Sequence, residues 1–161
     1  MTDRPVTNSV TNATFTIERR YPAHPAKVFG AWADGDAKGI WMDDEDYASD
    51  GTEYELDFRV GGHERFGGQD PAGVPYRYDA VYYDIVPDHR IVYCYEMYTG
   101  AERMSVSLTT VEIVPDGDGT RLTYTEQCAF LDGLDKPEAR HEGTVFILDN
   151  LGRYLAERAG D

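Results

Sequence analysis

The sequence predicts an α+β domain in which a curved antiparallel sheet of about seven strands packs against one long C-terminal helix. Segments of alternating apolar and polar residues recur between positions 13 and 130, as strands with one buried face require. Short turns rich in Gly, Pro and Asp separate most of them, which favours antiparallel pairing. Residues 137–158 instead carry apolar side chains at helical spacing. Strand, two short helices, about six more strands and a long helix is an α+β order.

The N-terminal part of the chain supplies the first strand and the two short helices. Residues 1–12 are polar and predict a flexible tail, so that residues 13–161 form the single domain. Residues 13–21 alternate and predict the first strand. Pro25 suits the first turn of a short helix. Asp34 can cap a second short helix, which carries Trp41.

The remaining elements are predicted from the alternation typical of strands and the apolar spacing typical of helices. Alternation predicts further strands at residues 54–59, 63–66, 76–86, 90–98, 103–114 and 120–130. Asp135, with Glu138 three residues later, has the spacing of a capping box and is predicted to be the N-cap of the last helix. The apolar stripe of that helix is predicted to comprise Phe146, Ile147, Leu151, Tyr154 and Leu155.

Composition excludes several classes of function. The 161 residues suggest one domain, and 30 acidic against 15 basic residues give a net charge of −15. Such a surface repels phosphate backbones and anionic lipids, so no nucleic-acid or membrane partner is expected. No secretory signal and no apolar run of ~20 residues occurs, which predicts a soluble, cytoplasmic protein.

No motif predicts a metal or a cofactor. The four histidines are scattered, and Cys94 and Cys128 lack metal-ligand spacing and are expected to be reduced and buried. Phosphate-binding and dinucleotide-binding glycine patterns are missing from the sequence. The acidic segment 43–51 does not fit a calcium-loop template, because Ala48 stands where a ligand is needed.

Several short motifs point to a known family. Residues 57–62 read Asp-Phe-Arg-Val-Gly-Gly, residues 119–123 read Gly-Thr-Arg-Leu-Thr, and residues 148–151 read Leu-Asp-Asn-Leu. With the Trp-bearing segment 25–41, their order and spacing resemble the START-like (SRPBCC) helix-grip superfamily. Within it, the chain looks like the branch of homologues of the activator of heat-shock-protein-90 ATPase, over nearly everything after residue 12.

This resemblance implies a helix-grip fold with a ligand site between the sheet and the C-terminal helix. Relatives carry lipids, sterols, plant hormones or polyketide intermediates there, and a few are cyclases or dehydratases. Bacterial single-domain members generally lack the separate N-terminal domain of the eukaryotic co-chaperone. Chaperone activation is therefore not expected to carry over to this chain, and the fold alone does not fix a function.

Glu126 is the residue most suggestive of function. It shares the apolar face of the last predicted strand with Tyr124 and Cys128, and a carboxylate there must be hydrogen-bonded, paired or facing a wet cavity. One interpretation is a cavity group that anchors a ligand or acts as a general base. The other is a buried pair with an arginine or a tyrosine hydroxyl.

The leading hypothesis is binding of a small, largely apolar ligand. The predicted cavity residues are Trp41, Phe58, Tyr76, Tyr78, Tyr93, Tyr95, Ser107, Tyr124, Glu126, Phe146, Ile147 and Leu151. The first alternative is a cofactor-independent enzyme like polyketide cyclases and dehydratases, with Glu126 as general acid/base and Tyr93 or Tyr95 polarising a carbonyl. The second is a chaperone-linked interaction protein. Val106 and Leu108 make part of the strand at 103–114 apolar on both faces, which a homodimer through the outer face or cover by the N-terminal tail would explain.

Overall fold

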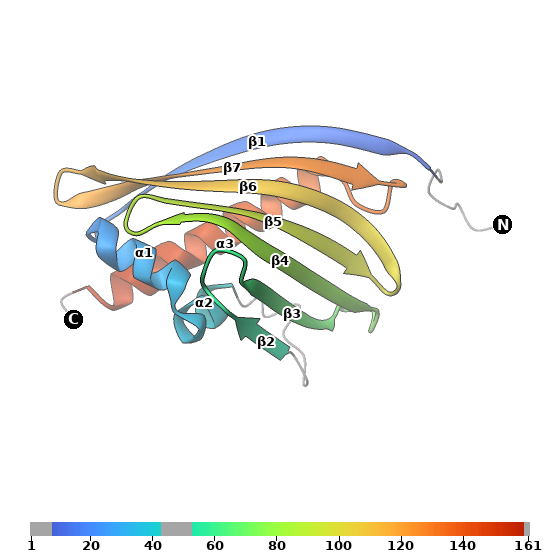
Figure 1. The fold of residues 1–161 in the computed structure, drawn as a ribbon, viewed down its shortest axis with the longest axis horizontal. Coiled ribbons are helices and arrows are strands. Elements are labelled where there is room, and N and C mark those ends of the chain that lie inside the picture. The colour runs from blue at the N-terminus through green and yellow to red at the C-terminus, as the bar shows by residue number, and fades with distance from the viewer. Residues whose placement is uncertain (1–7, 43–52, 160–161) are drawn as a thin grey trace.

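One antiparallel sheet and three helices make up the part of the chain that the structure, a computed structural model, describes: residues 8–42 and 53–159 (Figure 1). The strands are β1 (Val10–Tyr21), β2 (Glu53–Leu56), β3 (His63–Gln69), β4 (Pro75–Val86), β5 (Arg90–Thr99), β6 (Glu102–Asp116) and β7 (Gly119–Leu131). The helices are α1 (Pro25–Ala33), α2 (Gly35–Trp41) and α3 (Pro137–Glu157). The predicted α+β class and element order are confirmed.

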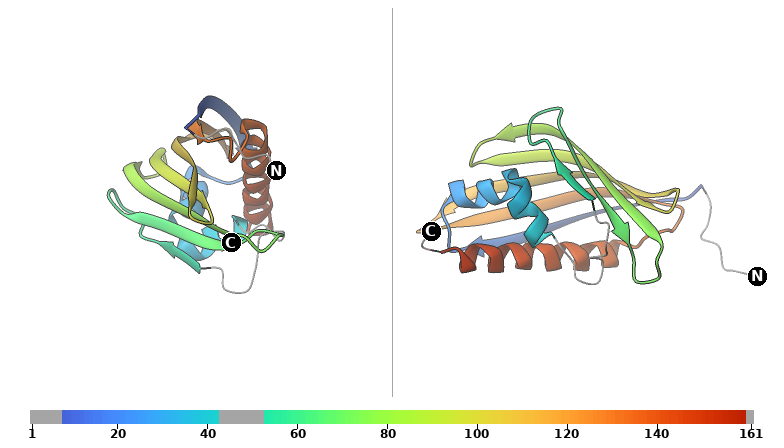
Figure 2. Two further views of the ribbon diagram at one scale, coloured as in Figure 1. Left: turned by 90° about the vertical axis from the view of Figure 1, so that its right-hand side faces the viewer. Right: turned by 90° about the horizontal axis from the view of Figure 1, so that it is seen from below.

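The sheet curves around α3, which runs along its concave side (Figure 2). The strand order is β1-β7-β6-β5-β4-β3-β2, so every neighbouring pair except β1 and β7 is consecutive in the sequence. Register shifts interrupt the β4–β5 pair after Tyr82 and the β5–β6 pair after Met97. Irregularities of this kind bend a strand and increase its twist. The bent central strands therefore wrap around the helix.

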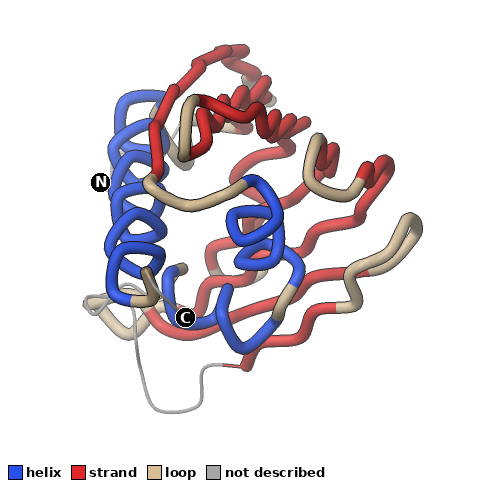
Figure 3. The backbone as a smooth tube through the Cα atoms, turned by 90° about the vertical axis from the view of Figure 1, so that its left-hand side faces the viewer, coloured by secondary structure: helices blue, strands red, loops and turns tan. Residues whose placement is uncertain are grey.

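Helices α1 and α2 lie at one end of the molecule, between α3 and the sheet (Figure 3). Asp34 caps α2 as predicted, since its side chain accepts a hydrogen bond from the backbone N–H of Asp36 at 3.0 Å. Trp32 and Trp41 meet edge to face with ring centroids 4.8 Å apart, and Trp41 Nε1 donates to the carbonyl of Ala31. These contacts place both indole rings in the core.

The buried stripe of α3 differs from the predicted one. The buried residues are Thr144, Leu148, Leu151 and Leu155, which follow one another at intervals of four, three and four. Phe146 is 42% exposed, because it stands two positions from Thr144 and thus on nearly the opposite side of the helix. Its assignment to the apolar stripe was wrong.

The predicted N-cap of α3 was also wrong. The N-cap position is occupied by Lys136, and no side chain caps it. Pro137 follows at the first helical position, and because proline has no backbone N–H, the start of the helix has one unpaired donor fewer. The carboxylate of Asp135 instead pairs with Nη2 of Arg140 at 2.9 Å. Asp135 therefore holds the side chain of Arg140 in place near the start of α3.

The outer face of the sheet is only partly apolar. Leu108 is 38% exposed and Val106 is half-buried, while their neighbour Ser107 points inward and is buried. The expectation of a homodimer through this face stays a prediction. None of the described helices is long and apolar enough to cross a lipid bilayer.

The paired glycines of segment 57–62 are required by a close approach of the backbone. Gly61 has a φ of +83°, which favours glycine. A Cβ on Gly62 would overlap the carbonyl oxygens of Asp57 and Arg59, the second of which accepts the Gly62 N–H at 2.7 Å. The loop between β2 and β3 therefore closes only without a side chain at position 62.

Replacing Gly62 by alanine should reduce the free energy of unfolding by about 1–3 kcal/mol, the usual cost of forcing atoms into a filled site. Gly30 is the matched control, because it lies inside α1 and a Cβ there would meet no atom within 4 Å. Gly30→Ala should instead stabilise the protein by about 0.5–1 kcal/mol. Urea unfolding of both variants measures the difference, and equal effects would refute this account of Gly62.

Candidate functional site

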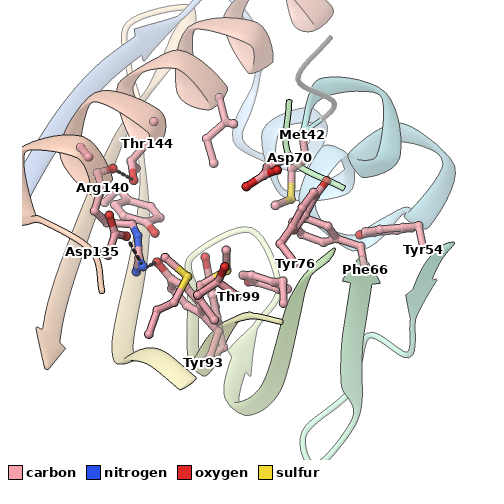
Figure 4. A pocket seen from close by; sticks show the side chains of 18 of the residues that line it. Met42, Tyr54, Phe66, Asp70, Tyr76, Tyr93, Thr99, Asp135, Arg140 and Thr144 are labelled. Atoms are coloured by element: carbon pink, nitrogen blue, oxygen red, sulfur yellow. Dashed lines mark hydrogen bonds and ion pairs between the residues drawn. The ribbon is translucent and has the colours of Figure 1, made fainter. Parts of the chain in front are cut away.

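A cavity of about 410 Å³ lies between the concave face of the sheet and α3 (Figure 4). Aromatic side chains form much of its wall: Tyr54, Phe66, Tyr76, Tyr78, Tyr93, Tyr95 and Tyr124. Met42, Met97 and Met104 add flexible apolar surface. From α3 come Ala139, Arg140, Gly143, Thr144 and Ile147, and Asp70, Thr99 and Asp135 contribute further polar groups. The cavity is thus mainly apolar, with polar groups at a few positions.

The predicted cavity residues fall into two groups. The wall includes Tyr76, Tyr78, Tyr93, Tyr95, Tyr124 and Ile147. The other six lie elsewhere: Trp41, Phe58, Ser107, Glu126, Phe146 and Leu151. Trp41 and Leu151 are packed in the core, and Phe58 packs edge to face on Tyr82 with centroids 5.0 Å apart. Ser107 and Glu126 are fully buried behind the wall, whereas Phe146 points outward. The structure thus places six of the twelve predicted residues in the wall of this cavity and six outside the wall.

Glu126 lies at the centre of a buried polar cluster and is 0% exposed. Its Oε2 accepts hydrogen bonds from Tyr95 at 2.6 Å and Ser107 at 2.8 Å. Oε1 accepts from Tyr124 at 2.8 Å, and Arg140 Nη1 lies 3.3 Å from Oε2. Both oxygens thus accept hydrogen bonds from protein donors, as a buried carboxylate requires. Of the two interpretations left open by the sequence, the geometry supports the buried pair.

Arg140 connects this cluster to the cavity wall. Its Nη1 also donates to the Tyr95 hydroxyl at 3.0 Å, and its Nη2 donates to Ser105 at 2.8 Å and to Asp135 at 2.9 Å. Burial alone would lower the pKa of Arg140, but Tyr95 and the carboxylates of Glu126 and Asp135 outweigh burial and raise the pKa. The guanidinium therefore remains charged and fixed in place.

A second buried ion pair, between Lys38 of α2 and Glu64 of β3, was missed by sequence reasoning. Lys38 is 1% and Glu64 0% exposed, and Lys38 Nζ lies 2.8 Å from Glu64 Oε2. Tyr54 donates to the same oxygen at 2.6 Å, while Tyr82 and Tyr78 donate to Oε1 at 3.2 and 3.3 Å. Burial lowers the pKa of Lys38, and the adjacent carboxylate opposes that decrease. Two carboxylates rather than one therefore support the tyrosine wall.

A sequence signal for Glu64 did exist. Glu64 stands two residues before Phe66 in the predicted strand and therefore shares its inward face. The reasoning that singled out Glu126 applies here without change. Lys38 carried a weaker signal, three residues before the buried Trp41 in a short amphipathic helix.

Tyr93 joins the two clusters through hydroxyl contacts. Burial and the carboxylates of Glu64 and Glu126 raise its pKa, whereas hydrogen bonds with Tyr124 and Tyr78 act in the opposite direction. Burial also raises the pKa of Tyr78 and Tyr95, with further contributions from Glu64 and Glu126 respectively. The hydroxyls of Tyr78, Tyr93 and Tyr95 are therefore protonated at neutral pH.

Within residues 8–42 and 53–159, no group of three or more His, Cys, Asp or Glu side chains is arranged to hold a metal ion. The acidic segment 43–51 lies outside the described residues. Among the described lining residues, the polar side chains are hydroxyls, carboxylates and the guanidinium of Arg140.

Comparison with known proteins is consistent with this architecture. The family described as "Activator of Hsp90 ATPase homolog 1-like protein" matches residues 22–156. A solved structure of an uncharacterised Rhizobium leguminosarum protein has 44% sequence identity and a TM-score of 0.87, covering 92% of this chain and 97% of that one. A Rhizobium loti protein has 51% identity and a TM-score of 0.85, covering 92% of this chain and 100% of its own. No curated protein is significantly similar in sequence.

Proposed function

The chain belongs to the family of Activator of Hsp90 ATPase homolog 1-like proteins, and we propose that it binds a small, largely apolar molecule between the sheet and α3. The observation that carries the proposal is the cavity of about 410 Å³, which aromatic and methionine side chains line. Its volume lies in the range of small-molecule sites. A ligand that buries about 200 Å² of apolar surface would gain about 5 kcal/mol from desolvation.

The buried clusters support binding because they hold the aromatic wall in position. Tyr95 and Tyr124 are fixed through Glu126, and Tyr78 is fixed through Glu64. The rings of Tyr78 and Tyr95 also stack, with centroids 4.8 Å apart. Side chains that are ordered before binding lose little conformational entropy when the ligand arrives. The cavity wall is therefore pre-organised to bind an apolar ligand.

The same contacts disfavour acid–base catalysis by Glu126. A general base must reach the proton that it abstracts, directly or through one water. Glu126 does not line the cavity, and both of its oxygens are occupied by protein donors. Tyr95, suggested by the sequence as a group that could polarise a carbonyl, directs its proton to Glu126 instead. Binding without turnover fits this arrangement better.

A substitution that fills the cavity should weaken binding of an apolar fluorescent probe. Ile147→Trp places a larger side chain at a lining position of α3, and it should weaken binding of N-phenyl-1-naphthylamine at least about tenfold, a loss of about 1.4 kcal/mol. The matched control is Phe146→Trp, one residue away on the exposed side. The control should bind the probe as the original chain does.

Fluorescence titration of the three proteins decides the matter, with thermal unfolding to show that each variant is folded. Equal affinity for Ile147→Trp and Phe146→Trp would place the probe outside the cavity. Absence of binding by the unsubstituted chain, to this probe and to a panel of apolar molecules, would remove the proposal itself.

A further inference from the structure

Four of the tyrosines that line the cavity donate their protons away from it. Tyr95 and Tyr124 donate to Glu126, and Tyr54 and Tyr78 donate to Glu64. A phenol has one proton and two lone pairs, and an ionised carboxylate only accepts. These hydroxyls therefore have no proton left for a ligand, and what they can offer it is a lone pair.

Tyr93 connects the two clusters, because its hydroxyl interacts with those of Tyr78 and Tyr124. Its hydroxyl is therefore engaged within the wall as well.

Among the described lining residues, Arg140 is the cationic group, and its guanidinium is already engaged. Nη1 donates to Tyr95 and Glu126, and Nη2 donates to Ser105 and Asp135. A carboxylate ligand would have to compete with these partners. Arg140 therefore balances buried acids rather than offering a free anion site.

The charges near the cavity favour a cation. Asp70 lies across the cavity from Asp135 and Arg140 (Figure 4). Oδ1 of Asp70 accepts the backbone N–H groups of Ala72 and Val74, so the carboxylate is held at the wall. Among the described residues, the lining and its two supporting clusters contain four carboxylates and two cationic groups: Asp70, Asp135, Glu64, Glu126, Lys38 and Arg140. Aromatic faces add further attraction for a positive charge.

Resting on the proposed binding function, we infer that the cavity selects apolar molecules whose polar end is a hydrogen-bond donor, a protonated amine above all, and rejects those that end in a carboxylate. The ammonium would donate to tyrosine lone pairs and face Asp70, while the apolar part contacts the aromatic and methionine side chains. A carboxylate would meet lone pairs and like charge at the same positions.

Three molecules with one apolar skeleton test this inference: naphthalene-1-methanamine, naphthalene-1-methanol and naphthalene-1-carboxylate. At neutral pH their polar ends are cationic, neutral and anionic. Calorimetry on the full chain should give affinities in that order, with the amine at least about tenfold tighter than the carboxylate, equivalent to about 1.4 kcal/mol.

Asp70→Asn provides the test within the cavity. Asparagine retains the Oδ1 acceptor for Ala72 and Val74 but removes the charge, so the advantage of the amine over the alcohol should fall several-fold. Asp118→Asn, in the exposed turn between β6 and β7, makes the same change of net charge away from the cavity and should leave that advantage unchanged.

The outcomes separate the inference from the function on which it rests. If neither the apolar probe nor any of the three molecules binds, the proposed function fails. If they bind but the carboxylate is as tight as the amine, binding stands and the donor selectivity is overturned. The selectivity is overturned equally if Asp70→Asn and Asp118→Asn have the same effect.

Discussion

Raising the pH above about 10 should unfold the protein in one cooperative step. Burial raises the pKa of seven tyrosines above the ordinary value of 10.0: Tyr21, Tyr54, Tyr78, Tyr82, Tyr93, Tyr95 and Tyr124. In the unfolded chain these groups release protons near pH 10, whereas in the folded chain they retain them. Above pH 10 each tyrosine therefore favours unfolding by about 1.4 kcal/mol per pH unit.

Lys38 has the opposite effect on the pH dependence of stability, but it is a single group. Its pKa is lowered on folding, so between that value and 10.5 the unfolded chain binds more protons, and stability rises with pH. The net change above pH 10 remains strongly destabilising. The measurement is tyrosinate absorbance in the near ultraviolet followed together with far-ultraviolet circular dichroism. Ionisation of all twelve tyrosines while the circular dichroism signal is intact would contradict the burial described here.

Replacing Lys38 by methionine should lower the free energy of unfolding by about 3–5 kcal/mol, because Glu64 would remain buried without its cation. Urea unfolding measures the loss. The control is Lys27→Met, since Lys27 is exposed on α1 and its replacement should cost under about 0.5 kcal/mol. The double variant Lys38→Met/Glu64→Gln also lacks the unpaired carboxylate, so it should regain much of the stability. If Lys38→Met alone were as stable as Lys27→Met, the buried ion pair would be contradicted.

The strands were predictable because alternation is a local signal. Each strand needs only its own sequence to show which face is apolar, and β4 to β7 accordingly lie close to their predicted positions. Which side of α3 faces the core was harder to predict. Its buried stripe begins with Thr144, a polar residue, so the apolar pattern alone favoured Phe146. The N-cap error at Asp135 has a similar origin, because the capping box does not reveal the competing partner Arg140.

The site was predictable only in part, because its partners come from distant segments. Alternation identified Glu126 as an inward carboxylate, but Tyr95 lies 31 residues before it and Arg140 lies 14 residues after it. Glu64 could have been found by the same alternation, whereas its partner Lys38 on α2 lies 26 residues away. Whether a residue lines the cavity or stands behind its wall depends on how α3 docks on the sheet, which no local pattern encodes.

Methyl NMR of the methionines tests the central claim most directly. Met42, Met97 and Met104 come from α2's C-terminal end, β5 and β6, and all three line the cavity. Binding of N-phenyl-1-naphthylamine between the sheet and α3 should shift the methyl signals of all three, through the ring currents of the probe. If the probe binds while these signals remain where they were, the ligand lies elsewhere and the cavity is not the binding site.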